Sequence, residues 1–123
     1  MAAIRSKNTK PELFVRRMVH AMGYRYRLHC EDLPGKPDMV FASRWKIILV
    51  HGCFWHRHHN CGRATSPKTR TEYWQEKFAS NIERDRRTMR KLRSLGWGVM
   101  KVWECELRRS EKLAKRISRF LAS

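Results

Sequence analysis

Apolar side chains recur at two spacings along this chain, and the two spacings predict different elements. In three segments they return every three or four positions, as on the buried face of an amphipathic helix, and these segments are residues 11–22, 71–95 and 110–121. Pro11 suits the first turn of a helix, whereas Gly23 and Gly96 follow the first two segments and provide C-terminal stops. The sequence therefore predicts three helices.

Four shorter segments have the pattern of strands. Tyrosine and leucine alternate with arginine over residues 24–28, which predicts a half-exposed strand with one basic face. Three further strands, the first two forming a hairpin, are predicted at residues 38–41, 47–50 and 99–103. The two strands of the hairpin are almost continuously apolar, so we expect them at the centre of the sheet.

The order of these elements is one helix, three strands, a helix, a strand and a helix, which is typical of a mixed α/β domain with helices covering a small sheet. A chain of 123 residues is long enough for one such core but not for two of ordinary size. We therefore expect a single domain over residues 11–123. Residues 1–10 are polar and basic without a period, which predicts either an arm that orders on a partner or a frayed terminus.

Charge points to the class of partner. The chain has 28 Lys and Arg against 11 Asp and Glu, a formal net charge of +17. Lys and Arg that neutralise phosphates release condensed counterions, so nucleic acid is the default partner of such a chain. A membrane surface is disfavoured because the basic residues are spread over the whole chain rather than along one amphipathic helix. Residues 1–10 then fit an arm that enters a DNA groove.

The cysteines point to a metal. No apolar run approaches the ~20 residues that span a bilayer, and no charged start followed by an apolar segment marks secretion, so we expect a cytoplasmic protein. In the cytoplasm, clustered Cys and His indicate a metal site before a disulfide. Cys30 lies apart from the cluster, which is formed by Cys53 and Cys61 with the histidines between them.

Cys53, His58 and Cys61 are close enough in sequence for one loop to wrap a tetrahedral ion. Cys105, at the end of the last predicted strand, would complete a Cys3His structural zinc site. His59 is an alternative to His58, because both lie within reach of the same loop. The competing interpretation is that Cys53 and Cys105 are small buried apolar residues.

Asp38, His51 and His56 indicate a second site. An aspartate at the start of one strand of a hairpin faces the end of the next, so Asp38 and Val50 are expected to meet at one edge of the sheet. Mg²⁺ prefers oxygen ligands, and Asp38 with a backbone carbonyl near Val50 would suit it. A neutral His51 or His56 can accept a proton from an attacking water. Glu12 is explained either by the dipole of the first helix or by a role at this site.

Phe54 and Trp55 are adjacent aromatic residues inside a polar loop, and Trp74 opens the long helix. One interpretation is insertion between base pairs, because stacking on a base contributes roughly 1–3 kcal/mol. The other is burial over the zinc site. The long helix also has a basic face, formed by Lys77, Arg84, Arg86, Arg87, Arg90 and Arg93. Few acidic residues balance these charges, so contact with phosphates is favoured.

Several motifs together resemble a known family. HGCFWHRH, LPGKPD, RTEYW, NIERDRR and VWECEL are similar to motifs of the very short patch repair (Vsr) DNA mismatch endonucleases, and the similarity extends from Met1 to beyond Arg108. It implies a PD-(D/E)XK-type nuclease core, restriction-endonuclease-like, with an added structural zinc. It also implies that the protein uses Mg²⁺ and water to nick one strand of double-stranded DNA, on the 5′ side of the thymine of a T:G mismatch.

The resemblance also implies roles at the matching positions. Asp38 would be the metal-binding catalytic carboxylate and His56 the general base, with His51 and Glu12 as supporting residues. The wedge beside the mismatch would comprise Phe54, Trp55 and Trp74, and the residues that read it would be Lys77 and Asn81. Zinc would be held by Cys53, His58, Cys61 and Cys105.

The chain departs from the general nuclease signature in three respects. The second acid and the lysine of that signature are absent, since Leu49, Val50 and His51 stand in their place. Where Val50 stands, family members commonly have a threonine that gives its backbone carbonyl to the metal, so a valine can serve equally. Members also usually have residues before the position of Met1, so we expect part of the DNA-clasping arm to be missing from this chain.

Three hypotheses follow. The first is a mismatch-specific endonuclease that starts repair of deaminated 5-methylcytosine as a monomer, together with mismatch-repair proteins. The second is a restriction-like or defence nuclease on the same scaffold, which matched and mismatched DNA would separate from the first. The third is a zinc-stabilised DNA-binding module without catalysis, which would keep its activity when Asp38 is replaced by Asn.

Overall fold

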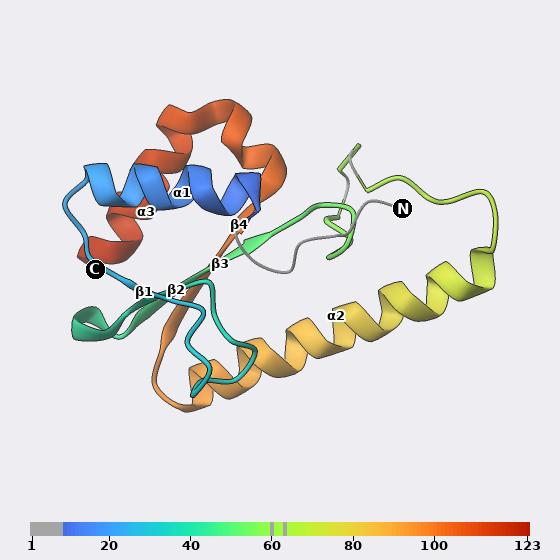
Figure 1. Ribbon diagram of the computed structural model, residues 1–123, viewed down its shortest axis with the longest axis horizontal. Helices are drawn as coiled ribbons and strands as arrows, with labels where there is room; N and C mark the ends of the chain where they lie inside the picture. The colour runs from blue at the N-terminus through green and yellow to red at the C-terminus, as the bar shows by residue number, and fades with distance from the viewer. Residues whose placement is uncertain (1–8, 60, 63) are drawn as a thin grey trace.

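A small sheet lies between two helices on one face and one long helix on the other in the computed structural model, which describes residues 9–59, 61–62 and 64–123 (Figure 1). Its helices are α1 (Lys10–Ala21), α2 (Thr71–Ser94) and α3 (Ser110–Ala122). Its strands are β1 (Arg27–Leu28), β2 (Met39–Phe41), β3 (Lys46–His51) and β4 (Gly98–Trp103). Two 3-10 helices follow β2 and β4, at Ala42–Arg44 and Glu104–Arg109. The predicted mixed α/β class is confirmed.

The sheet has the order β1-β2-β3-β4. β1, β2 and β3 pair antiparallel, and β4 pairs parallel with β3, so α2 is the crossover that parallel neighbours require. The prediction that β2 and β3 are central is confirmed. Their hairpin aligns Met39 with Ile48, which brings the residue before β2 alongside the end of β3.

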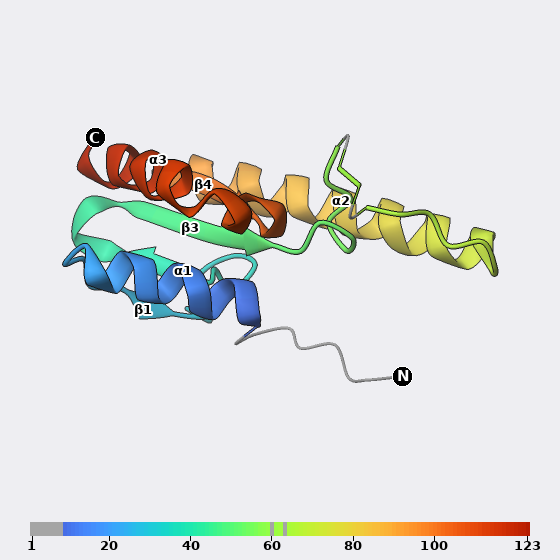
Figure 2. The ribbon, with the colours of Figure 1, turned by 90° about the horizontal axis from the view of Figure 1, so that it is seen from above.

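The two faces of the sheet bury alternate residues. Met39, Phe41 and Ile48 face α1 and α3, which lie on the same side of the sheet (Figure 2). Val40 and Ile47 belong to a second cluster, on the opposite face, with Leu92 of α2. Both faces of the central strands are therefore covered, which explains their continuously apolar sequence.

Helix α1 begins two residues before its first buried side chain, Glu12. The Thr9 side chain accepts a hydrogen bond from the Glu12 backbone N–H at 3.3 Å, and this cap satisfies one of the free amides of the first turn. Helix α1 begins at Lys10, the last residue of the predicted arm, and residues 1–8 of that arm lie outside the described part of the chain. The helix buries Glu12, Val15 and Val19.

Three sequence expectations were wrong in detail. The segment 24–28 pairs only at Arg27–Leu28, because Tyr24 still donates its backbone N–H to Val19 at the end of α1. Phe14, expected on the buried face of α1, is 41% exposed, and Leu95, expected on that of α2, is 54% exposed. Leu95 is the C-cap of α2 and follows its last helical residue, so the helical periodicity no longer places it on the buried face.

Helix α2 is longer than the sheet it covers. Its C-terminal half packs on the sheet through Leu92, whereas its N-terminal half extends past the sheet beside the loop that joins β3 to α2 (Figure 1). The overhanging half of α2 is therefore available to form one wall of a site.

None of the helices in the described ranges combines the length and the apolar character needed to cross a membrane.

Leu92 and Leu95 provide a matched test of this packing. Leu92→Ala removes a fully buried side chain and should cost about 2–5 kcal/mol of unfolding free energy, whereas Leu95→Ala should change it by about 0.5 kcal/mol or less. Urea unfolding of the two variants measures both values. Equal losses would show that α2 does not pack as described.

Candidate active site

A cleft of about 800 Å³ opens between α1, the ends of β2 and β3, and the overhanging half of α2. Most of the residues predicted from the sequence for catalysis and DNA contact line it: Glu12, Asp38, Val50, Phe54, Trp55, His56, Trp74, Lys77 and Asn81. The Cys and His residues predicted to bind zinc form a separate cluster, and His51 lies in a second hollow.

Asp38 lies at the base of the cleft, where the hairpin brings it to the end of β3. Its Oδ2 accepts a hydrogen bond of 2.7 Å from the Val50 backbone N–H. Burial, and then a side-chain hydrogen bond with Glu12, raises the pKa of Asp38 to about 8, although the bond from Val50 acts in the opposite direction. Without a cation, the two carboxyl groups thus share a proton near neutral pH.

The second carboxylate of this pair, Glu12, is only 2% exposed. Its Oε2 accepts a hydrogen bond of 2.7 Å from Arg16, and its Oε1 lies 2.8 Å from Nε2 of His29. One ligand atom from each of Glu12, His29 and Asp38 lies within 4.8 Å of the others, so this group can hold a metal ion. Sequence reasoning missed His29, which follows the strand predicted at residues 24–28 and belongs to no motif.

His56 forms a dyad with a residue that sequence reasoning missed. Its Nδ1 lies 2.6 Å from Oδ2 of Asp85 on α2. Burial opposes ionisation of Asp85, but the hydrogen bond and the charges of His56, His51 and Arg84 outweigh it and lower the pKa of Asp85. An ionised Asp85 requires the proton of His56 on Nδ1, which leaves Nε2 as a proton acceptor. The available signal was an isolated acid within the basic run RDRR.

His51 has a different environment. Its ring stacks on that of His56 with centroids 3.9 Å apart and planes at 9°. Burial, and then the nearby His56, lowers the pKa of His51 to about 3, and its Nδ1 has no hydrogen-bond partner within the described ranges. An imidazole that resists protonation is a weak base. Of the two histidines considered from the sequence, His56 therefore has the geometry of a base and His51 that of a packing partner.

Cys53, His58, Cys61 and Cys105 each place one ligand atom within 4.8 Å of the others, so this group too can hold a metal ion. Nδ1 of His58 lies 3.6 Å from Sγ of Cys53 and 3.4 Å from Sγ of Cys105. Two ligand atoms of a tetrahedral zinc ion with bonds of ~2.0–2.3 Å are expected about 3.6 Å apart, and both distances agree with this spacing. His59, the alternative ligand, is exposed and outside this group.

Two further features support a closed metal cluster. Burial raises the pKa of Cys53 to about 12, so this thiol needs a cation beside it to become a thiolate. The Trp103 ring stacks on His58 at 4.1 Å and covers one side of the group. Cys30 is remote from it and donates its thiol hydrogen to Asp32 at 3.0 Å.

The aromatic residues form one half-buried cluster at the mouth of the cleft. The Phe54 ring lies 5.1 Å from Trp55, 5.3 Å from Phe78 and 5.9 Å from Trp74. Trp55 and Trp74 are 5.6 Å apart. The ring that covers the Cys and His cluster is Trp103, so the geometry does not favour the alternative that Phe54 and Trp55 are buried there.

Asn81 and Lys77 lie next to this aromatic cluster on α2. The Asn81 side chain is buried, donating to the Trp55 backbone carbonyl at 3.2 Å and accepting from Arg84. It therefore fixes the loop that carries Trp55. Lys77 is exposed at the edge of the cleft.

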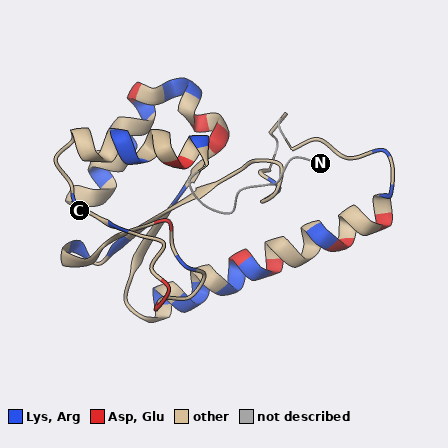
Figure 3. Ribbon diagram, viewed as in Figure 1, with Lys and Arg blue, Asp and Glu red and all other residues tan. Residues whose placement is uncertain are grey.

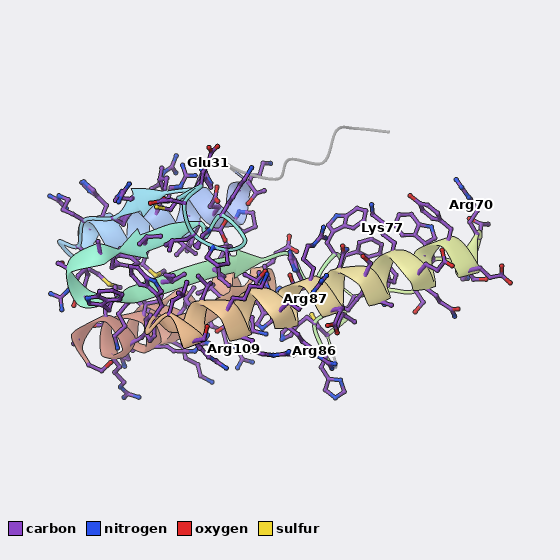
Figure 4. All side chains as sticks on the ribbon, turned by 90° about the horizontal axis from the view of Figure 1, so that it is seen from below. Glu31, Arg70, Lys77, Arg86, Arg87 and Arg109 are labelled. Atoms are coloured by element: carbon purple, nitrogen blue, oxygen red, sulfur yellow. The ribbon has the colours of Figure 1, made fainter. Side chains whose placement is uncertain are left out.

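Basic residues continue beyond the cleft and occur on all three helices (Figure 3). A second hollow, of about 810 Å³, adjoins the first at His56 and is lined by Arg86, Arg90, Arg93 and Lys101, among others. Lys77 and Arg86 point from opposite sides of α2 (Figure 4). The basic face predicted from the sequence is thus divided between two hollows that share a histidine.

Comparison with known proteins agrees with this geometry. Residues 1–63 match the family model of the DNA mismatch endonuclease Vsr. V.XorIIP, a type II nicking enzyme of Xanthomonas oryzae pv. oryzae, is 48% identical over 121 residues, which cover 98% of this chain and 88% of the relative. DNA mismatch endonuclease Vsr of Escherichia coli is 45% identical over 113 residues, covering 92% of this chain and 72% of the relative.

Among solved structures, the catalytic domain of the homing endonuclease I-Bth0305I matches with a TM-score of 0.65 over 94% of this chain and 96% of that domain. Its sequence identity is 20%, so the likeness concerns the fold alone. The family is established by the matches in sequence, which span nearly the whole chain: the protein belongs to the Vsr family of DNA endonucleases.

Proposed function

We propose that this endonuclease nicks one strand of duplex DNA on the 5′ side of the thymine of a T:G mismatch, with Mg²⁺ and water, and so starts very short patch repair of deaminated 5-methylcytosine. The observation that carries the proposal is the composition of one cleft. It combines a buried pair of carboxylates, the His56–Asp85 dyad and a cluster of aromatic rings. These are the parts needed to hydrolyse a phosphodiester beside a distorted base pair.

Asp38, Glu12 and the Val50 backbone carbonyl would hold Mg²⁺. Two carboxylates that share a proton without a cation form a donor set for a hard dication, which can replace that proton. In an extended strand the N–H and C=O of one residue point to the same side, so the Val50 carbonyl faces the side of β3 on which its N–H meets Asp38. Bound there, Mg²⁺ supplies Lewis-acid stabilisation of charge on the phosphate.

The His56–Asp85 dyad would activate the nucleophile. Nε2 of His56 takes a proton from water as the water oxygen bonds to phosphorus and the bond to the leaving oxygen breaks. Asp85 holds the imidazole in the tautomer that leaves Nε2 free to accept and stabilises the imidazolium that forms. His51 supports the dyad by stacking on His56. Because the pKa of His51 is low, only the His56 ring of this stacked pair takes up a proton.

Recognition of the mismatch is assigned to the aromatic cluster. Phe54, Trp55 and Trp74 lie at the mouth of the cleft, where half-buried rings can stack against bases that a mismatch leaves weakly paired. Lys77, which lines the cleft from α2, would contact the mismatched bases. Asn81, on the same helix, would also read the mismatched bases. Its buried side-chain amide already holds the Trp55 loop in place.

The rest of the surface would bind the DNA backbone. The exposed Arg86, Arg90 and Arg93 have no ion-pair or hydrogen-bond partner within the described ranges, so they remain available for phosphates. We assign residues 11–123 to a single nuclease domain and residues 1–10 to an arm that contacts DNA. A T:G mismatch is asymmetric, so one monomer suffices, and the nick is the substrate for mismatch-repair proteins.

Zinc is assigned to the Cys and His cluster. Cys53, His58, Cys61 and Cys105 tie the loop after β3 to the segment after β4, and binding contributes roughly 10–16 kcal/mol in structural sites of this kind. Phe54, Trp55 and His56 lie within this loop, between two of the ligands. The zinc would therefore hold the wedge and the base in place on a PD-(D/E)XK-type core.

A second candidate is a restriction-like nicking enzyme. Several relatives, including V.XorIIP, are type II nicking enzymes. The same cleft can serve either role, because the two roles differ in the DNA context that is cut and not in the chemistry.

A nicking assay separates the two candidates. We expect the T-containing strand of a T:G duplex to be cut when Mg²⁺ is added, and the T:A counterpart to remain intact. The metal-free control is made by leaving out Mg²⁺ and not by adding a chelator, because a chelator would also remove zinc. Asp38→Asn should abolish nicking while DNA binding is retained. Equal cutting of T:G and T:A duplexes would favour the restriction-like role.

The dyad predicts a specific effect of Asp85→Asn. The asparagine amide can donate as well as accept and carries no charge, so it no longer fixes the His56 tautomer or stabilises the imidazolium, and kcat should fall roughly 10²-fold or more with little change in KM for the duplex. Glu83→Gln, two residues away and exposed on the same helix, is the matched control and should leave kcat unchanged. An Asp85→Asn variant with normal kcat would remove the dyad from the mechanism.

The zinc assignment is tested by paired cysteine variants. Cys105→Ser should abolish the bound zinc and lower the thermal unfolding midpoint, because serine is a poor zinc ligand. Cys30→Ser, at a buried cysteine outside the cluster, should keep one zinc per chain. Metal analysis of both purified variants gives the result, and a Cys105→Ser variant that retains stoichiometric zinc would contradict the assignment.

A further inference from the structure

We propose that His29 is a positioning residue of the active site, which holds the Glu12 carboxylate in the orientation required beside Asp38. No motif or site prediction from the sequence includes it. The inference rests on the proposed function of Glu12 and Asp38 as a metal site, and it concerns how the protein fixes the second of these two carboxylates.

The two oxygens of Glu12 are held by donors from two different elements. Arg16 of α1 donates to Oε2 at 2.7 Å, and Nε2 of His29, just after β1, lies 2.8 Å from Oε1. One donor alone would leave the carboxylate free to turn about its axis, whereas two fix its plane. Each oxygen can accept a second bond, so Glu12 remains able to face a cation or its bound water.

The backbone places His29 directly opposite Asp38. The His29 N–H donates to the Asp38 carbonyl at 3.3 Å, which extends the pairing of Leu28 with Met39 by one residue. His29 also has a φ of 44°, a left-handed conformation that is unfavourable for a residue with a Cβ. The same strand pairing therefore positions the catalytic aspartate and the donor to its neighbour, at a cost in backbone strain.

The hydrogen-bond geometry assigns His29 the role of donor rather than of ligand. Nε2 of His29 lies 2.8 Å from Oε1 of Glu12 and 3.4 Å from the Arg16 guanidinium, which can only donate. The contact with Glu12 is the shorter of the two, and with Glu12 ionised it assigns the imidazole proton to Nε2. The lone pair is then on Nδ1, on the other side of the ring from Glu12. A glutamine can reproduce this donor, because its amide nitrogen reaches about as far from the backbone as Nε2 does. An asparagine carries the same amide one methylene shorter and tolerates a left-handed backbone.

The experiment compares His29→Asn with His29→Gln in the zinc-loaded protein. Mn²⁺ serves as the probe, and its binding is followed by loss of the free Mn²⁺ electron paramagnetic resonance signal. His29→Asn should raise the Mn²⁺ dissociation constant about tenfold or more and lower kcat for the mismatched duplex, with an unchanged KM. His29→Gln should stay within about threefold of the unmodified protein. His20→Asn, at an exposed histidine of α1, is the matched control and should match the unmodified protein.

Asp38→Asn separates failure of this inference from failure of the proposed function. If it binds Mn²⁺ as tightly as the unmodified protein, the metal does not lie in the cleft, and the proposed site is wrong. If only Asp38→Asn weakens binding and His29→Asn does not, the cleft holds the metal and the role of His29 is overturned. Equal weakening by His29→Asn and His29→Gln, at unchanged thermal midpoints, would also overturn it, because a donor would then be insufficient.

Discussion

The candidate active site depends on two carboxylic acids that are held close together in a buried position. Asp38 and Glu12 meet at the base of the cleft, and like charges there are stable only with a shared proton, cationic partners or a dication. The protein supplies part of the compensation from three elements, through the Val50 N–H of β3, Arg16 of α1 and His29 after β1. The site therefore exists only when the sheet and α1 are assembled, and the proposed dication would complete the compensation.

The other half of the site depends on a loop with little regular structure. The segment between β3 and α2 carries Phe54, Trp55 and His56, and it is held from two sides. Four Cys and His side chains gather it against the segment after β4, while His56 and the aromatic rings contact the overhanging half of α2. This explains why α2 is longer than the sheet: its buried Leu92 anchors it, and its far half forms the second wall of the cleft.

Much of the fold could be predicted because local periodicity and the sheet agree. The apolar runs that became β2 and β3 could only be central strands, and a hairpin between them necessarily brings Asp38 to Val50. The spacing of Cys53, His58 and Cys61 likewise restricts them to one loop. Prediction failed at the helix end: Leu92 is buried inside α2, whereas Leu95, three residues later at its C-cap, is 54% exposed.

The sequence by itself determined the class of the fold, the basic character that suits DNA, and the residues of the carboxylate and cysteine sites, because these follow from local pattern and composition. Tertiary structure decided which groups pair across elements. Asp85 reaches His56 from α2, and His29 reaches Glu12 from the end of β1, over separations of 29 and 17 residues. It also distinguished two histidines that are equivalent in sequence. His51 is buried and resists protonation, whereas His56 faces the cleft with an acid behind it, since burial and hydrogen-bond partners are set by the packing of distant segments.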